Sequence, residues 1–103
     1  MAVQLQVDSE RLADFCRRWN ITELALFGSA LRSDFRSDSD VDVLVAFAPG
    51  RHHRLADLTR MEDELTLIFG RPVDLVTRPS VERSRNYVFR QQALGTRQPL
   101  YVA

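Results

Sequence analysis

The chain has 103 residues, of which 45% are hydrophobic and 27% charged, and its formal net charge is zero. This size and balance fit one small globular domain, so we expect residues 1–103 to form a single domain. No apolar run approaches the roughly 20 residues that a membrane span requires, and the first ten residues lack the pattern of a signal peptide. We therefore expect a cytoplasmic protein without membrane association. Zero net charge also argues against direct binding to nucleic acid.

All fourteen basic residues are arginine, and they are unevenly distributed. Residues 1–50 hold five Arg and eight acidic residues, a net charge of −3, whereas residues 51–103 hold nine Arg and six acidic residues, a net charge of +3. Codon usage that favours Arg is one explanation, and recognition of phosphates or carboxylates by guanidinium groups is the other. The Arg-rich segment from Arg78 to Arg97 is therefore a candidate docking surface.

The first predicted element is an amphipathic helix over about residues 10–19, with Ser9 as its N-cap. Four side chains at helical spacing mark its buried face: Leu12, Phe15, Cys16 and Trp19. Cys16 is the only cysteine, which leaves no disulfide framework and no cysteine-based zinc site, so we interpret it as a small buried hydrophobe. A short apolar strand, Glu23–Phe27, follows and ends at Gly28-Ser29, where a further short helix is expected to begin.

The rest of the chain alternates between strands and helices. After a polar loop over residues 32–39, Val41–Phe47 is the strongest strand because it is rich in β-branched and aromatic residues. A helix over about residues 54–69, capped by Gly70, precedes a strand at Val73–Thr77. A third helix is predicted from Ser80 to about residue 93, before a short apolar end at residues 99–102. This alternation predicts an α/β fold, a small β-sheet with helices packed against it.

Asp40 and Asp42 stand where the strongest strand begins. Residues i and i+2 of a strand point to the same side, about 6.6 Å apart, so both carboxylates project from one face. Such a pair can share one divalent cation or bridge two, and an oxygen-only ligand set favours Mg²⁺ together with substrate phosphates. The alternative is that both aspartates are turn and strand-cap residues, because Ser-Asp-Ser-Asp is common in turns.

Gly28-Ser29 supplies a candidate partner for phosphates. A glycine at the end of a strand allows the backbone to approach a ligand closely, and a helix that begins there offers free N–H groups to an anion. Ser29 would add a hydroxyl donor, and Arg32 is a candidate phosphate contact. The alternative is a plain turn between strand and helix.

Asp74 interrupts the apolar strand Val73–Thr77, which is an unfavourable place for an unpaired acid. If that strand lies beside Val41–Phe47, Asp74 completes an acidic triad that could ligate metal and help to deprotonate an attacking hydroxyl. The alternative is a structural ion pair with a nearby Arg. The adjacent His52 and His53 diverge in direction, so we expect them in a surface loop and not in a metal site.

These residues resemble the minimal nucleotidyltransferases of the DNA polymerase β superfamily. Gly28-Ser29 in "LFGS", ten residues, Asp40-x-Asp42 in "SDVDVLV" and Asp74 in "VDLV" match the family pattern, and the likeness extends over most of the chain. The family often has Arg-Gly shortly after Gly-Ser, where this chain has Arg32-Ser33. The resemblance implies a polymerase β-like nucleotidyltransferase fold with a small mixed sheet.

The resemblance also implies a function. It implies transfer of AMP from ATP to a protein hydroxyl, with two Mg²⁺ ions held by Asp40, Asp42 and Asp74, and nucleotide contacts from Gly28, Ser29 and Arg32. Many short members act as antitoxins of HEPN-domain toxins, some by modifying a toxin tyrosine, so the expected partner is a HEPN-domain toxin. Two rivals stay open at this point: a binding module with a vestigial site that silences a toxin by occlusion, and a nucleotidyltransferase for small molecules.

Overall fold

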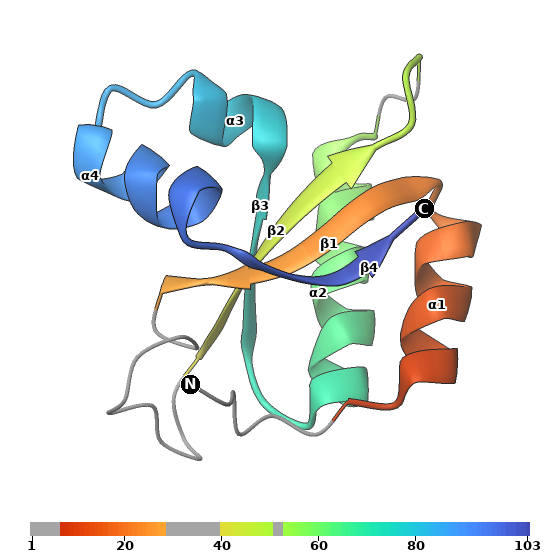
Figure 1. Ribbon diagram of the computed structural model, residues 1–103. Helices are drawn as coiled ribbons and strands as arrows, with labels where there is room; N and C mark the ends of the chain where they lie inside the picture. The colour runs from red at the N-terminus through yellow and green to blue at the C-terminus, as the bar shows by residue number, and fades with distance from the viewer. Residues whose placement is uncertain (1–6, 29–39, 51–52) are drawn as a thin grey trace.

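The computed structural model describes residues 7–28, 40–50 and 53–103 as a mixed four-stranded sheet with helices on both faces (Figure 1). The strands are β1 (Ile21–Phe27), β2 (Val41–Phe47), β3 (Val73–Thr77) and β4 (Gln98–Val102), in the spatial order β3-β2-β1-β4. The helical elements are α1 (Ser9–Arg18), α2 (Leu55–Phe69), α3 (Arg78–Glu82), α4 (Tyr87–Arg90) and the π-helical turn η2 (Gln91–Gly95). The predicted fold class is confirmed. No helix in these described ranges is long and apolar enough to cross a membrane.

Helix α1 agrees with the prediction except at its N-cap. Asp8, not Ser9, is the capping residue, because its carboxylate accepts hydrogen bonds from the backbone N–H groups of Glu10 and Arg11. A side-chain acceptor of this kind satisfies N–H groups that have no partner within the helix. The helix ends at Arg18, and Asn20 then adopts a left-handed conformation with φ of 58°.

The main core lies between the sheet and helices α1 and α2. Strand β2 contributes Val41, Val43 and Val45 to it, while Leu44 faces the opposite side, as the period of two in a strand requires. The predicted helix face is buried, with Trp19 and Tyr101 packed at the margin of this core. The buried residues of the core are Leu12, Phe15, Cys16, Ile21, Leu24, Leu26, Val41, Val43, Val45, Met61, Leu65 and Phe69.

Cys16 is fully buried, as predicted, and forms no disulfide. Burial raises the pKa of the Cys16 thiol to about 12, because the low-polarity surroundings disfavour the thiolate, and the nearby Arg17 charge offsets only part of this. Cys16 is therefore a packing residue and not a nucleophile.

The predicted third helix from Ser80 to about residue 93 is wrong, because the segment folds as three short pieces. Thr77 caps α3, and a second capping residue, Asn86, starts α4 by accepting a hydrogen bond from the Phe89 N–H at 3.0 Å. Ser84 in turn accepts from the Asn86 N–H, which closes the intervening turn. Side chains that bond to nearby backbone interrupt a helix in this way. The apolar end of the chain is β4, which pairs with β1.

The prediction of a surface loop for the histidine pair is half right for His53, which lies in a loop but is largely covered. Its side chain is only 13% exposed and packs against the ring of Phe47, with centroids 4.3 Å apart, and against Trp19 at 5.8 Å. Its Nε2 has no hydrogen-bond partner among the described residues. His52 lies outside the described residues.

Candidate functional site

Asp42 and Asp74 are direct neighbours across the two parallel strands β2 and β3. The register pairs Val41 with Val73 and Asp42 with Asp74, and it continues through Leu44 and Val76. Residues in register on adjacent parallel strands point to the same side, with strands about 4.8 Å apart. The predicted adjacency of the two strands is confirmed, and both carboxylates project from one face of the sheet.

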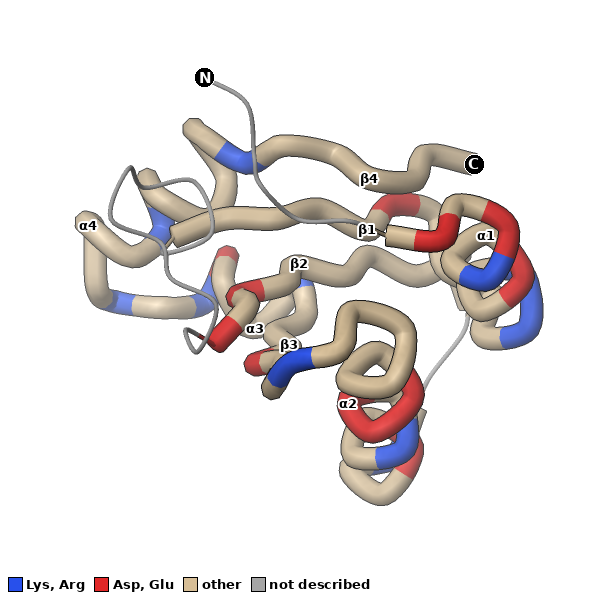
Figure 2. Tube along the Cα trace, turned by 90° about the horizontal axis from the view of Figure 1, so that it is seen from below, with Lys and Arg blue, Asp and Glu red and all other residues tan. Residues whose placement is uncertain are grey.

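The face that carries these carboxylates is opposite the main core. Leu44 and Val76, two residues after Asp42 and Asp74, belong to a second, smaller apolar cluster with α3, α4 and η2. Asp40, two residues before Asp42, is exposed at the edge where β2 begins. Figure 2 shows the acidic positions gathered where β2 and β3 start.

Gly28 completes the described part of the site because it lies against Asp42. The residue before it, Phe27, pairs with Asp42 across β1 and β2. Gly28 has φ of 64°, and a Cβ atom built on it would be 2.7 Å from Oδ2 of Asp42. A side chain at position 28 would therefore displace that carboxylate, so the glycine is required both by the backbone conformation and by the space. Ser29 and Arg32, the other predicted nucleotide contacts, lie outside the described residues.

Like charges interact at the site. The pKa of Asp74 is raised above its ordinary value of 3.8, first by partial loss of hydration and then by the charges of Asp42, Glu62 and Asp40. Asp74 remains exposed to solvent, so its loss of hydration is incomplete. A cation near these carboxylates would reverse the repulsion and favour their ionised form.

Glu62 is a residue of the site region that sequence reasoning missed. Its Oε2 accepts a hydrogen bond of 3.0 Å from the backbone N–H of Leu75, the residue after Asp74. Strand β3 is at the edge of the sheet, so this bond satisfies a donor that no further strand can pair. The only sequence signal was an acid next to Met61, at the border of the apolar face of its helix.

The donor set fits a hard divalent cation. Asp40, Asp42 and Asp74 offer only carboxylate oxygens, two of them on neighbouring strands in register, and Mg²⁺ prefers such ligands. Within residues 7–28, 40–50 and 53–103, no three carboxylate, imidazole or thiolate side chains converge into a ready-made metal cage. Mg²⁺ usually takes one or two carboxylates and completes its shell with water and substrate phosphates.

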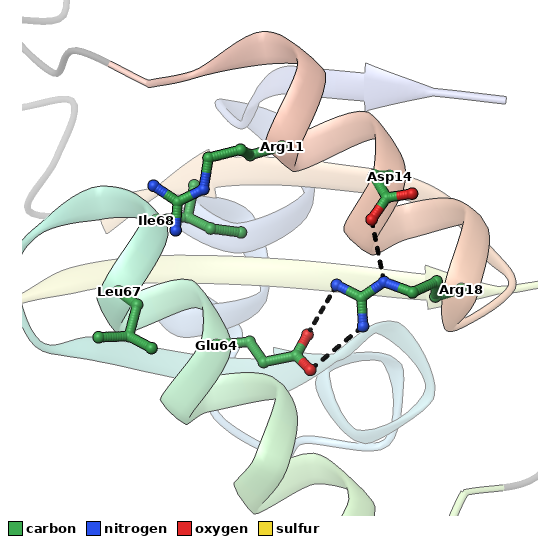
Figure 3. A pocket seen from close by; sticks show the side chains of 6 residues that line it. All are labelled: Arg11, Asp14, Arg18, Glu64, Leu67 and Ile68. Carbon is green, nitrogen blue, oxygen red and sulfur yellow. Dashed lines mark hydrogen bonds and ion pairs between the residues drawn. The ribbon is translucent and has the colours of Figure 1, made fainter.

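A hollow between α1 and α2 is a weaker candidate (Figure 3). It has a volume of about 270 Å³, and three of its four charged lining residues, Asp14, Arg18 and Glu64, pair with one another. Arg18 forms an ion pair with Asp14 at 3.1 Å and a two-pronged contact with Glu64 at 3.2 and 3.3 Å. Because these three residues are engaged with one another, the hollow is a weak ligand site, and the carboxylates in register on β2 and β3 are the better candidate.

Comparison with known proteins gives a family match over residues 9–94, to the nucleotidyltransferase domain. A Methanocaldococcus jannaschii protein that carries the provisional name of protein adenylyltransferase is 36% identical over 61 residues, which cover 59% of this chain and 63% of that protein. Protein adenylyltransferase MntA of Thermococcus cleftensis is 35% identical over 65 residues, covering 63% of this chain and 64% of that protein. The match thus spans less than two thirds of the length of each curated relative.

Solved structures share the fold. One that carries the provisional name of minimal nucleotidyltransferase has a TM-score of 0.59 and 32% identity, covering 82% of this chain and 81% of that chain. A toxin–antitoxin crystal structure with AMP-PNP has a TM-score of 0.69 at 18% identity, covering 94% of this chain and 75% of that chain. A complex of a tri-AMPylated Shewanella oneidensis HEPN toxin with an MNT antitoxin has a TM-score of 0.60 at 21% identity, covering 92% and 70%.

Proposed function

The chain belongs to the nucleotidyltransferase domain family, and we propose that it transfers AMP from ATP to a hydroxyl group of a protein. The observation that carries the proposal is the placement of Asp42 and Asp74 in register on β2 and β3, with Gly28 held against the Asp42 carboxylate. Carboxylates in register on two neighbouring strands, beside a close backbone approach, suit a metal-bound triphosphate, because a cation between phosphate and carboxylate groups offsets their mutual repulsion.

The reaction assigns a role to each site residue. A hydroxyl oxygen of the acceptor attacks the α-phosphorus of ATP, a new P–O bond forms, and the bond to the departing pyrophosphate breaks. The hydroxyl proton passes to the carboxylate of Asp74. Gly28, with Ser29 and Arg32, binds the phosphates through the backbone, a hydroxyl and a guanidinium group.

Asp40, Asp42 and Asp74 would hold the Mg²⁺ ions, two in the full site. When bound, these ions supply charge neutralisation at the triphosphate and at the departing pyrophosphate. The residues themselves supply position, since Asp42 and Asp74 are fixed by the β2–β3 hydrogen bonds. Rigid strands hold such groups more accurately than loops do.

We propose a HEPN-domain toxin as the acceptor and modification of one of its tyrosines as the means of silencing it. Two solved structures that share the fold are toxin–antitoxin complexes, one with an ATP analogue and one with an AMPylated HEPN toxin, which supports this choice. The rival is silencing by occlusion alone, with the carboxylates left unused.

The test is to incubate the protein with a HEPN-domain protein encoded beside it, ATP and Mg²⁺, and to weigh the intact partner by mass spectrometry. Mass increments of one or more AMP units are expected with the wild type and are expected to vanish with Asp42→Asn. Asp63→Asn, which makes the same change at an exposed carboxylate of α2, is the matched control and should remain active. If wild type and Asp42→Asn silence the partner equally without any change in its mass, occlusion is the correct account.

A further inference from the structure

We propose that α4 and the turn before it form a docking surface for an acidic, partly apolar protein segment that carries the acceptor hydroxyl. We call this the α4 surface and define it by Arg83, Arg85, Tyr87, Val88 and Arg90. The inference rests on the proposed transferase function, because it names where the acceptor protein binds. Three observations support it: the exposure of these side chains, their positive charge and the position of α4 on the sheet.

The α4 surface exposes large apolar side chains on a helix of only four residues. Tyr87 is 64% and Val88 63% exposed, although Phe89 between Val88 and Arg90 packs inward. Beside them lies a hollow of about 360 Å³ lined by Tyr87, Arg90, Gln91, Leu94 and Gly95. Paired exposed apolar groups next to a hollow are typical of the centre of a protein interface.

The charge around these groups is positive and unmatched. The sequence after Glu82 holds four Arg and no Asp or Glu (Figure 2). Arg97 is engaged internally, with its Nε 2.7 Å from Glu23. In contrast, Arg83 and Arg85 are exposed and form no ion pair within the part of the chain that the structure describes. A partner with acidic side chains would supply the missing counter-charges.

Arg90 links the charged and the apolar parts of the surface. Its guanidinium group lies over the ring of Tyr87, 6.0 Å from the centroid, while the Tyr87 hydroxyl accepts a hydrogen bond of 2.8 Å from Gln91. These contacts limit the freedom of the exposed ring before any partner binds. A side chain that is already ordered loses less entropy on binding, which is why Tyr and Arg dominate interface energetics.

The α4 surface lies close enough to the carboxylate face of the sheet for a bound protein to present its acceptor hydroxyl there. On the inner side of α4, Phe89 packs edge-on against Phe27, with centroids 6.0 Å apart. Phe27 is the register partner of Asp42. Helix α4 therefore covers the same face of the sheet that carries the carboxylates, and a protein bound to its outer side could present a hydroxyl at that face.

An RNA strand is the other anionic partner that guanidinium groups could bind. The structure favours a protein because exposed Tyr87 and Val88 stand between the arginines, and an aliphatic side chain there adds nothing to phosphate binding. The zero net charge of the whole chain points the same way, since nucleic-acid binding domains are commonly basic.

The test measures peptide binding and AMP transfer separately. The probe is a fluorescently labelled 12-residue peptide with one tyrosine, several Asp and Glu, and two leucines. Its controls are the same peptide with every acid replaced by lysine, and a 12-nucleotide single-stranded RNA. Binding is followed by fluorescence anisotropy, and modification of the tyrosine is followed by mass spectrometry with ATP and Mg²⁺.

The acidic peptide should bind about tenfold more tightly than the lysine peptide, and Arg83→Glu/Arg85→Glu should reverse most of that preference. Tyr87→Ser/Val88→Ser should weaken binding of the acidic peptide. Arg60→Glu, the same reversal at an exposed arginine of α2, should leave binding unchanged. Circular dichroism checks folding, and Arg83→Gln/Arg85→Gln replaces the reversed pair if that pair fails to fold.

The outcomes separate the two proposals. Equal binding of both peptides, or equal binding by all variants, overturns the α4 surface whatever the transfer result. RNA binding that is tighter than peptide binding and indifferent to Tyr87→Ser/Val88→Ser also overturns it, in favour of a nucleic-acid site. Charge-dependent peptide binding without any transfer supports the surface, and the experiment with the intact HEPN-domain partner then decides the transferase function.

Discussion

Replacing Gly28 with alanine tests the contact on which the site depends. Gly28 has φ of 64°, and a left-handed backbone costs a residue with a Cβ roughly 1–2 kcal/mol. Alanine also lowers the conformational entropy of the unfolded chain, which stabilises the folded state by about 0.4–1 kcal/mol. The net loss in free energy of unfolding should therefore be about 1 kcal/mol from the backbone alone.

Gly70→Ala is a matched control for this backbone cost. Gly70 has φ of 74° at the end of α2, and a Cβ there would meet nothing within 4 Å. At Gly28 the same atom would be 2.7 Å from Oδ2 and 3.6 Å from the Cβ of Asp42. Both variants should lose similar stability, but only Gly28→Ala must turn the Asp42 carboxylate away from its place.

The consequence for binding is the decisive measurement. Displacing a carboxylate from a metal and phosphate site should weaken binding of Mg²⁺ with AMP-PNP by about 10–100-fold, the effect usual for a disturbed ligand shell. Isothermal titration calorimetry measures the affinity, and urea unfolding measures the stability of the same samples. If folded Gly28→Ala binds the nucleotide as tightly as Gly70→Ala does, the close approach to Asp42 has no role in the site.

Four further outcomes follow from the carboxylates and the buried thiol. Mg²⁺ with AMP-PNP should raise the melting temperature of wild type and Asp63→Asn but not of Asp42→Asn, and an equal rise in all three would remove Asp42 from the site. Without metal, the raised pKa of Asp74 favours the folded state at low pH, and this contribution is lost as the pH rises above 3.8. Asp74→Asn should therefore gain stability relative to wild type as the pH rises above 3.8. If the free energies of unfolding from urea titrations change with pH in parallel for the two proteins, the reasoning is refuted. Cys16 should react with a thiol reagent only on unfolding, and Cys16→Ser should cost about 1–3 kcal/mol for a buried hydroxyl without a partner.

Local signals in the sequence determined several elements to the residue. The bounds of β2 and β3 agree with the prediction because β-branched residues between polar or proline-containing segments leave little choice of where each strand begins and ends. Gly70 ends α2 as predicted, since the left-handed residue that follows a helix is most often glycine. The spacing of Gly28-Ser29, Asp40-x-Asp42 and Asp74 was sufficient to identify the family, but the roles of these residues stay predictions.

Contacts between distant segments decided the rest. That Asp74 lies beside Asp42, and that Gly28 leaves room for the Asp42 carboxylate, depends on which strands pair and in which register, and hydrogen bonds between separate strands set both. In the sequence, His53 is an ordinary polar residue, but in the structure the rings of Trp19 and Phe47 cover it. No local sequence pattern indicates these contacts. The predicted third helix is divided because the caps at Thr77 and Asn86 and the packing of Phe89 on Phe27 together outweigh a continuous helix.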